Sequence, residues 1–136
     1  MTVLKIAEAA GLLGVSEDTV RRWAEAGRLE TTRLPSGRQG VDGRVLAEAA
    51  VRLADAGEAG EAGPIVAQSA RNRFRGIVTK VTRDGVMAQV ELQSGPHRVV
   101  SLMSREAADE LGLEPGVVAV AAVKSTNVVV EIPEAR

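Results

Sequence analysis

The hydrophobic periodicity of this 136-residue chain changes once, near residue 57. Before that point apolar residues recur at the i, i+3, i+4, i+7 spacing of an amphipathic helix, as in Ile6–Leu13 and Leu46–Leu53. After residue 72 the spacing falls to two, and one face of a predicted strand carries Val86, Ala88, Val90 and Leu92. Because helices and strands bury their apolar residues at different periods, the chain is predicted to be an α+β protein of two domains.

The segment between the two patterns, Ala56–Pro64, contains three glycines at a spacing of three. Each glycine costs about 1 kcal/mol inside a helix, which favours a linker. A frayed extension of the preceding helix is the alternative. We therefore predict a helical domain at 1–55, a linker at 56–67 and a β-rich domain at 68–133.

Composition narrows the range of functions. The chain has no cysteine, so disulfides, thiolate metal sites and cysteine nucleophiles are excluded, and a reducing cytoplasm is the expected location. The net charge of −1 indicates neither a nucleic acid nor a membrane surface as partner. No apolar run is long enough to span a bilayer. The single histidine, His97, is interpreted as a surface turn residue, and we expect no enzyme, no catalytic residue and no metal site.

The helical half contains signals for a turn followed by a second helix. We interpret Gly11–Ser16 as the turn, with Ser16 as N-cap of a helix at 17–26 and Gly27 at its C-terminal end. Trp23 lies on the predicted apolar face with Val20 and Ala24, and is assigned to the core.

The segments Ile6–Ala10, Leu12–Ser16 and Thr19–Trp23 resemble the MerR and excisionase class of winged helix-turn-helix proteins, and Leu34–Gly43 resembles their wing. The resemblance covers about residues 3–54. It implies a three-helix domain whose second helix enters the major groove of double-stranded DNA. The residues that it implies for DNA binding are Ser16, Thr19, Arg21, Arg22 and, on the wing, Arg38.

Charge weakens this interpretation. Residues 1–56 contain eight Lys/Arg and eight Asp/Glu, so one copy should bind phosphates weakly, whereas two copies on paired half-sites could compensate. A three-helix protein-interaction module is the alternative.

The β-rich half is predicted to form five strands, at about 72–82, 86–93, 96–103, 117–123 and 126–132. A short helix near 104–111 should start at Ser104 as N-cap and stop at Gly112. Five short strands with one helix before the fourth are compatible with a closed, OB-like β-barrel.

Two polar motifs stand at predicted strand ends, Ser69–Asn72 and Lys124–Thr126. A tetrahedral dianion needs several donors and enough positive charge to offset its desolvation. The motifs supply an arginine, a lysine and hydroxyls without any carboxylate. On the residues alone, ordinary surface loops remain the alternative.

The order and spacing of several motifs resemble the Mop, or molbindin, family of TOBE-type domains. These motifs are Ser69–Val78, Gly85–Val90, Val100–Ser104, Leu111–Gly116 and Val123–Val129. The resemblance implies molybdate or tungstate bound at subunit interfaces, with no organic cofactor. Its ligand positions are Ser69, Ala70 through its backbone N–H, Arg71, Asn72, Lys124, Ser125 and Thr126, with Ser101 and Ser104 near a second kind of interface site. Asn72 could equally hold the turn, and Arg73 and Arg75 are interpreted as solvated strand residues.

Together the halves predict a molybdate-responsive one-component transcriptional regulator that forms at least a dimer, with a hexamer as a larger arrangement. The alternative is a molybdate storage or buffering protein whose helical half serves assembly. A third hypothesis is a DNA-architectural protein whose barrel only oligomerises.

Overall fold

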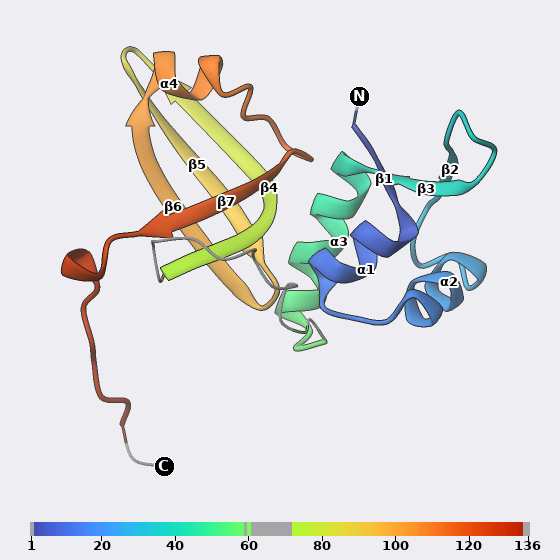
Figure 1. Ribbon diagram of the computed structural model, residues 1–136. Helices are drawn as coiled ribbons and strands as arrows, with labels where there is room; N and C mark the ends of the chain where they lie inside the picture. Colours follow the sequence, from blue (N-terminus) through green and yellow to red (C-terminus); the bar gives the residue numbers. More distant parts are fainter. Residues whose placement is uncertain (1, 59, 61–71, 135–136) are drawn as a thin grey trace.

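The computed structural model describes residues 2–58, 60 and 72–134, and it has the predicted α+β character (Figure 1). The N-terminal part contains β1 (Val3–Lys5), α1 (Ile6–Leu13), α2 (Glu17–Glu25), β2 (Thr32–Arg33), β3 (Gln39–Asp42) and α3 (Gly43–Asp55). The C-terminal part contains β4 (Asn72–Asp84), β5 (Met87–Ser94), β6 (His97–Ser104), α4 (Arg105–Glu110), β7 (Val118–Val123) and the 3₁₀ helix η1 (Ser125–Asn127).

The predicted second helix is confirmed to within one residue. The Ser16 hydroxyl accepts a hydrogen bond from the backbone N–H of Thr19 at 3.1 Å, as an N-cap should. At the other end Gly27 takes φ 76°, and the N–H of Arg28 donates to the carbonyl of Trp23 at 2.8 Å. This pattern is a Schellman motif. The predicted turn at 11–16 is too long, because α1 continues through Leu13.

The wing is a hairpin of β2 and β3. A third strand, β1, pairs with the other edge of β3, so that Val3 lies opposite Asp42. Sequence analysis did not predict β1, because three residues are too few to show a period.

Helix α3 ends at Asp55. Gly57 takes φ 72°, and the N–H of Glu58 donates to the carbonyl of Leu53 at 2.8 Å, which is a second Schellman motif. The alternative in which this helix extends into the glycine-rich segment is therefore wrong. The domain limits at 55 and 67 stay a prediction, since residues 61–67 lie outside the described ranges.

The C-terminal strands form one curled antiparallel sheet in the order β6-β5-β4-β7. Four of the predicted strands are present. Ser104 is the N-cap of α4, as predicted, and its hydroxyl accepts a hydrogen bond from the N–H of Ala107 at 3.1 Å. The predicted face of β5 is right for Ala88, Val90 and Leu92, which are buried. It is wrong for Val86, which lies in the preceding turn and is 78% exposed.

The fifth predicted strand, at 126–132, does not form within the chain. Ser125–Asn127 is a 3₁₀ helix, and the described residues after it pair with no strand. Alternation of side chains predicts an extended backbone, but a strand also needs a partner for its N–H and C=O groups. The sheet of the single chain is therefore four-stranded.

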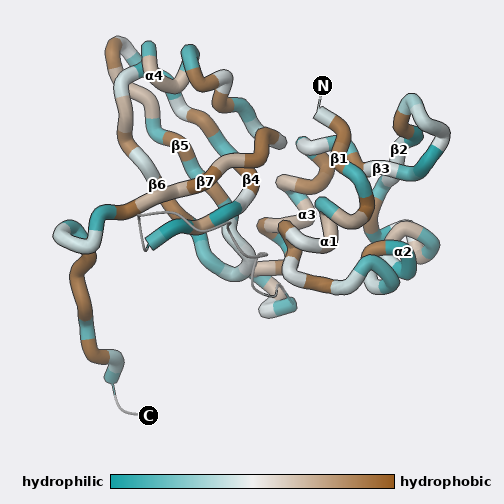
Figure 2. Tube along the Cα trace, viewed as in Figure 1, coloured by the Kyte–Doolittle hydropathy of each residue, from teal (hydrophilic) through white to brown (hydrophobic). Residues whose placement is uncertain are grey.

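The two parts pack against each other through β4. Ile77, 1% exposed, belongs to the core formed by the three N-terminal helices, and Val78, 0% exposed, belongs to the core of the sheet. Helix α3 lies next to β4, and Figure 2 shows hydrophobic residues on both elements. At one end of this contact Gly43 meets Gly116, and a Cβ on Gly43 would lie 2.3 Å from the Gly116 carbonyl oxygen.

Trp23 is less buried than predicted. It is half-buried beside the helical core, and the Arg28 guanidinium lies 5.3 Å from its ring centroid, within the range of a cation–π contact. Among the described helices, none has the length and hydrophobicity that crossing a bilayer requires.

The glycine contact yields a stability prediction. Gly43→Ala should lower the free energy of unfolding by about 1–3 kcal/mol, because the new methyl group overlaps the Gly116 carbonyl. Gly85→Ala is the matched control, since a Cβ there meets nothing within 4 Å, and it should change stability by less than about 0.5 kcal/mol. Urea unfolding measures both, and equal stabilities of the two variants would contradict the close packing.

Candidate functional site

One exposed face of the N-terminal part combines α2 with the wing. Arg21, from α2, and Arg38, from the wing, line the same groove, which has a volume of about 710 Å³ and also includes Lys5 and Glu17. Both residues were predicted from the sequence to contact DNA. They are 17 positions apart in the chain, and the structure brings them to one groove. A groove with three cations and one acid is suited to an anionic partner.

The hydroxyls on α2 hold its first turn. Ser16 and Thr19 share a hydrogen bond of 2.9 Å between their side chains, and Arg22 Nη2 donates to Thr19 Oγ1 at 3.2 Å. Ser16 therefore has a structural role as cap, whatever else it contacts. Arg21 lies 3.8 Å from Glu17, and both side chains are about half exposed. Such an exposed pair contributes little, so Arg21 can exchange Glu17 for another anion at low cost.

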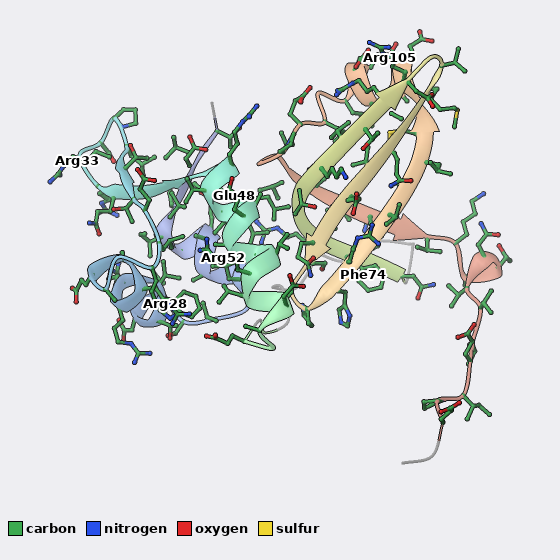
Figure 3. All side chains as sticks on the ribbon, turned by 180° about the vertical axis from the view of Figure 1, so that it is seen from behind. Arg28, Arg33, Glu48, Arg52, Phe74 and Arg105 are labelled. Carbon is green, nitrogen blue, oxygen red and sulfur yellow. The ribbon has the colours of Figure 1, made fainter. Side chains whose placement is uncertain are left out.

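Arg33 is a further cation of the wing hairpin that sequence analysis did not consider. It lies on β2, directly before the wing turn, and its Nη1 donates to the carbonyl of Gly37 at 2.9 Å. Figure 3 shows Arg33 on the outer side of the wing, away from the curled sheet. The signal was the run Thr31–Arg33 next to the wing motif, but the wing was expected to begin only at Leu34.

At the opposite end of the molecule, the start of β4 and the end of β7 lie together. Asn72 pairs with Val123, so Lys124 follows directly beyond this pair. The side chains of Lys124, Ser125 and Thr126 are exposed, and the N–H of Asn127 donates to the carbonyl of Lys124 at 2.9 Å. The residues Ser69, Ala70 and Arg71 lie outside the described ranges. The structure therefore places one predicted motif, and the last residue of the other, at one corner of the sheet.

Two arginines, Arg73 and Arg75, lie on β4 after Asn72. Arg73 and Arg75 are half-buried rather than fully solvated, which corrects their interpretation as solvated strand residues. Arg73 Nε is buried and finds no hydrogen-bond partner among the described residues. Arg73 directly follows Asn72 at this corner, whereas an Arg75 guanidinium nitrogen lies 4.0 Å from the position of a Cβ on Gly11 of α1, so Arg75 reaches toward the helical part.

Ser101 and Ser104 lie elsewhere on the sheet. Ser101 is exposed near the middle of β6, opposite Val90, and Ser104 pairs with Met87 at the start of β5. The β4–β5 turn lies at this end, whereas Asn72 is at the other end of β4. One chain thus does not bring these two serines to the Lys124 corner.

The other charged cluster is structural. Arg83 Nε donates to Asp109 at 3.0 Å, and its Nη2 donates to Glu114 at 3.0 Å and to the Leu113 carbonyl. The hydrogen bond with Asp109 is the largest cause that raises the pKa of Arg83 above its usual value. This arginine ties α4 and the following turn to β4. Among the described residues, no group of three or more histidines and acids is placed to hold a metal ion.

Comparison with known proteins identifies the C-terminal half. Residues 68–130 match the family described as TOBE domain. Molybdenum-pterin-binding protein 2 of Clostridium pasteurianum is 36% identical over 63 residues, which are 46% of this chain and 93% of that protein. The chain belongs to the TOBE-domain family. Molybdenum-pterin-binding protein 3 of the same organism is also 36% identical over 63 residues, with the same coverage.

Solved structures with similarity to the TOBE domain come from two organisms. MopII from Clostridium pasteurianum has 34% sequence identity, with 48% of this chain and 100% of that chain covered, at a TM-score of 0.46. A molybdate binding protein from Sporomusa ovata has 25% identity, with 49% and 100% covered, at a TM-score of 0.46.

The helical half has a match of its own. Residues 5–38 match the family described as MerR family regulatory protein. This segment runs from α1 to the wing and contains every residue predicted to contact DNA. The chain is therefore a fusion of a MerR-like helix-turn-helix with a TOBE domain.

Proposed function

We propose that this protein is a molybdate-responsive transcriptional regulator that binds DNA through α2 and the wing, and molybdate or tungstate through the TOBE domain. The observation that carries the proposal concerns strand β4. It begins at the Lys124 corner, and Ile77, near its middle, is buried in the core of the part proposed to bind DNA. The proposed site of action is the cytoplasm. The proposed activity is binding and not catalysis.

The chemistry of the corner supports an oxyanion ligand. Lys124 offers a compact cation, Ser125 and Thr126 offer hydroxyls, and Asn72 lies beside them in the sheet. Ser69, Ala70 and Arg71 are proposed to complete this donor set. Because Lys124–Thr126 are exposed in one chain, the anion is proposed to bind where two copies meet, with Ser101 and Ser104 at a second contact between copies.

The face of α2 and the wing supports DNA as the second partner. Thr19, Arg21 and Arg22 are proposed to lie toward the major groove, with Arg38 and Arg33 of the wing against the backbone. Since the N-terminal residues are electrically neutral overall, paired copies are proposed to bind two half-sites.

Strand β4 provides a route between the two sites. From Asn72 to Ile77 is five residues, or roughly 17 Å of extended chain. Ile77 is fully buried in the helical core, so a shift of the first half of β4 must displace side chains there. We propose that anion binding changes how copies pack and so resets the spacing of paired α2 helices.

Storage or buffering of molybdate is the second candidate. It is favoured by the relatives themselves, since 93% of Molybdenum-pterin-binding protein 2 matches 46% of this chain. That relative consists almost entirely of the matched segment and so has no counterpart of the helical half. In a storage protein, the helical half of this chain would then serve assembly.

The anion site predicts a charge-specific loss of affinity. Arg71→Ala and Lys124→Ala should each weaken molybdate binding by about 10- to 100-fold, because each removes a charge-assisted hydrogen bond. Lys80→Ala, which removes an exposed lysine in the middle of β4, is the control and should bind as wild type does. Isothermal titration calorimetry with molybdate, tungstate and sulfate measures these affinities. Unchanged affinity in both site variants would remove the assignment.

The DNA interface predicts a loss that depends on position and not only on charge. Arg22→Ala should weaken binding to promoter DNA by about 10-fold or more. Arg105→Ala, an equal charge change on α4, should have a much smaller effect. Fluorescence anisotropy on DNA from the protein's own promoter region measures both.

The same titration, repeated with and without molybdate, separates the candidates. Affinity that changes with the anion supports a regulator. Anion binding without DNA binding supports storage, and DNA binding that ignores molybdate supports an architectural protein.

A further inference from the structure

The first strand of the molecule, β1, brings a lysine to the edge of the wing. Leu4 is buried in the helical core and lies opposite Val41 of β3. Because successive side chains of a strand point to opposite faces, Lys5 points away from that core, and it is exposed. Figure 1 shows β1 beside β3, next to the hairpin that forms the wing.

The pairing of β1 with β3 depends on a glycine. Lys5 lies opposite Gly40, and Thr32 of β2 lies opposite the same glycine on its other side. A Cβ on Gly40 would lie 2.9 Å from the carbonyl oxygen of Leu4, which is closer than Cβ atoms approach such a group. Gly40 therefore lets β1 join the sheet of the wing, and this pairing fixes the backbone position of Lys5.

Lys5 lines the groove between α2 and the wing together with two residues predicted to contact DNA. These are Arg21 of α2 and Arg38 of the wing, and Glu17 is the only acid among the described lining residues. Arg21 shares its charge with Glu17, which lies 3.8 Å away. Within the described part of the chain, neither Lys5 nor Arg38 forms an ion pair. These two cations therefore supply the charge of the groove that no neighbouring carboxylate balances.

The position of Lys5 favours a phosphate over a base edge as its partner. Base edges are read by the element that enters the major groove, which is α2 in the proposed function. Lys5 comes from a strand beside α2, so it faces the sugar-phosphate backbone that borders that groove. Its ammonium group is a compact charge on a flexible stem, which suits a phosphate oxygen.

We propose that Lys5 binds a backbone phosphate of double-stranded DNA and holds α2 and the wing in one orientation on the duplex. This inference rests on the proposed function of the helical part, and it adds β1 to the two elements that the sequence assigned to DNA. Phosphate contacts fix orientation and register, and they carry no sequence information directly. Lys5 is therefore a positioning residue, and its loss weakens binding to every DNA sequence by the same factor.

The fold does not depend on the charge of Lys5. The hydrogen bond that Lys5 makes at the start of α1 comes from its backbone N–H, which donates to Glu8 Oε1 at 3.3 Å. Replacement of the side chain leaves this bond and the pairing with Gly40 in place. Lys5→Gln, which removes the charge at a similar side-chain length, therefore tests the contact in the folded protein.

The salt dependence of DNA binding tests the proposal. Each neutralised phosphate contributes about 0.9 to the slope of log K against log salt concentration. Lys5→Gln should reduce the magnitude of this slope by about one for each copy bound, and should weaken binding by about 5- to 10-fold per copy at about 0.1 M salt. Lys5→Arg keeps the cation and should keep the wild-type slope. Fluorescence anisotropy on DNA from the protein's own promoter region measures these slopes.

Lys80→Gln is the matched control, because it makes the same charge change at an exposed residue of β4. It should leave the slope unchanged. A second readout compares promoter DNA with scrambled DNA of the same length and composition. Lys5→Gln should weaken binding to both by the same factor, so that the ratio of the two affinities keeps its wild-type value.

The outcomes separate this inference from the proposed function. If the wild type binds promoter DNA and Lys5→Gln leaves the slope unchanged, the role of Lys5 is overturned while the function stands. A wild type that binds no DNA, with or without molybdate, overturns both.

Three further results would overturn the role of Lys5 alone. An equal change of slope in Lys80→Gln would show an effect of net charge. A changed ratio of promoter to scrambled affinity in Lys5→Gln would show a contact with bases. A loss of slope in Lys5→Arg as large as that in Lys5→Gln would show that the cation is not what binds.

Discussion

The structure depends on one strand that belongs to two cores. Successive side chains of a strand point to opposite faces, so Ile77 and Val78, adjacent on β4, cannot enter the same core. Ile77 packs among the N-terminal helices and Val78 packs inside the curled sheet. The curl places Gly76 so close to β5 that a Cβ would lie 2.3 Å from the carbonyl oxygen of Gln93. A larger residue there would open the sheet and withdraw Ile77 from the helices.

Because β4 contributes to both cores, the two parts are packed together, unlike two domains joined only by a linker. A flexible linker alone would let a TOBE domain bind its ligand without consequence for a distant helix-turn-helix. Here the contact of Gly43 with Gly116 and the burial of Ile77 allow no water layer between the parts at these points. The proposed coupling between the two sites therefore needs no large hinge motion, because side chains in a packed core cannot shift independently.

The features that could be predicted from sequence are the ones whose cause is local. Ser16 and Gly27 mark the ends of α2 because capping acts on neighbouring backbone groups, and the same holds for Ser104 on α4. The features that could not be predicted depend on what covers a face. The adjacent apolar residues Ile77 and Val78 are compatible with a strand that is buried on both faces, but they do not show that helices cover one of these faces. Trp23 lies on the apolar face as predicted, yet the core beneath it leaves it only partly buried.

The sequence predicted the positions of the candidate site, but not which of them lie together in one chain. Resemblance to a family names positions, and the pairing of Asn72 with Val123 explains why two motifs about 50 residues apart can act together. Ser101 and Ser104 cannot join them within one chain, because the length of the sheet lies between. A doubly charged oxyanion needs donors on several sides and shelter from water. Among the described residues, Lys124–Thr126 are exposed on one side of this corner, so the proposed site needs further donors from Ser69–Arg71 and shelter from a second copy.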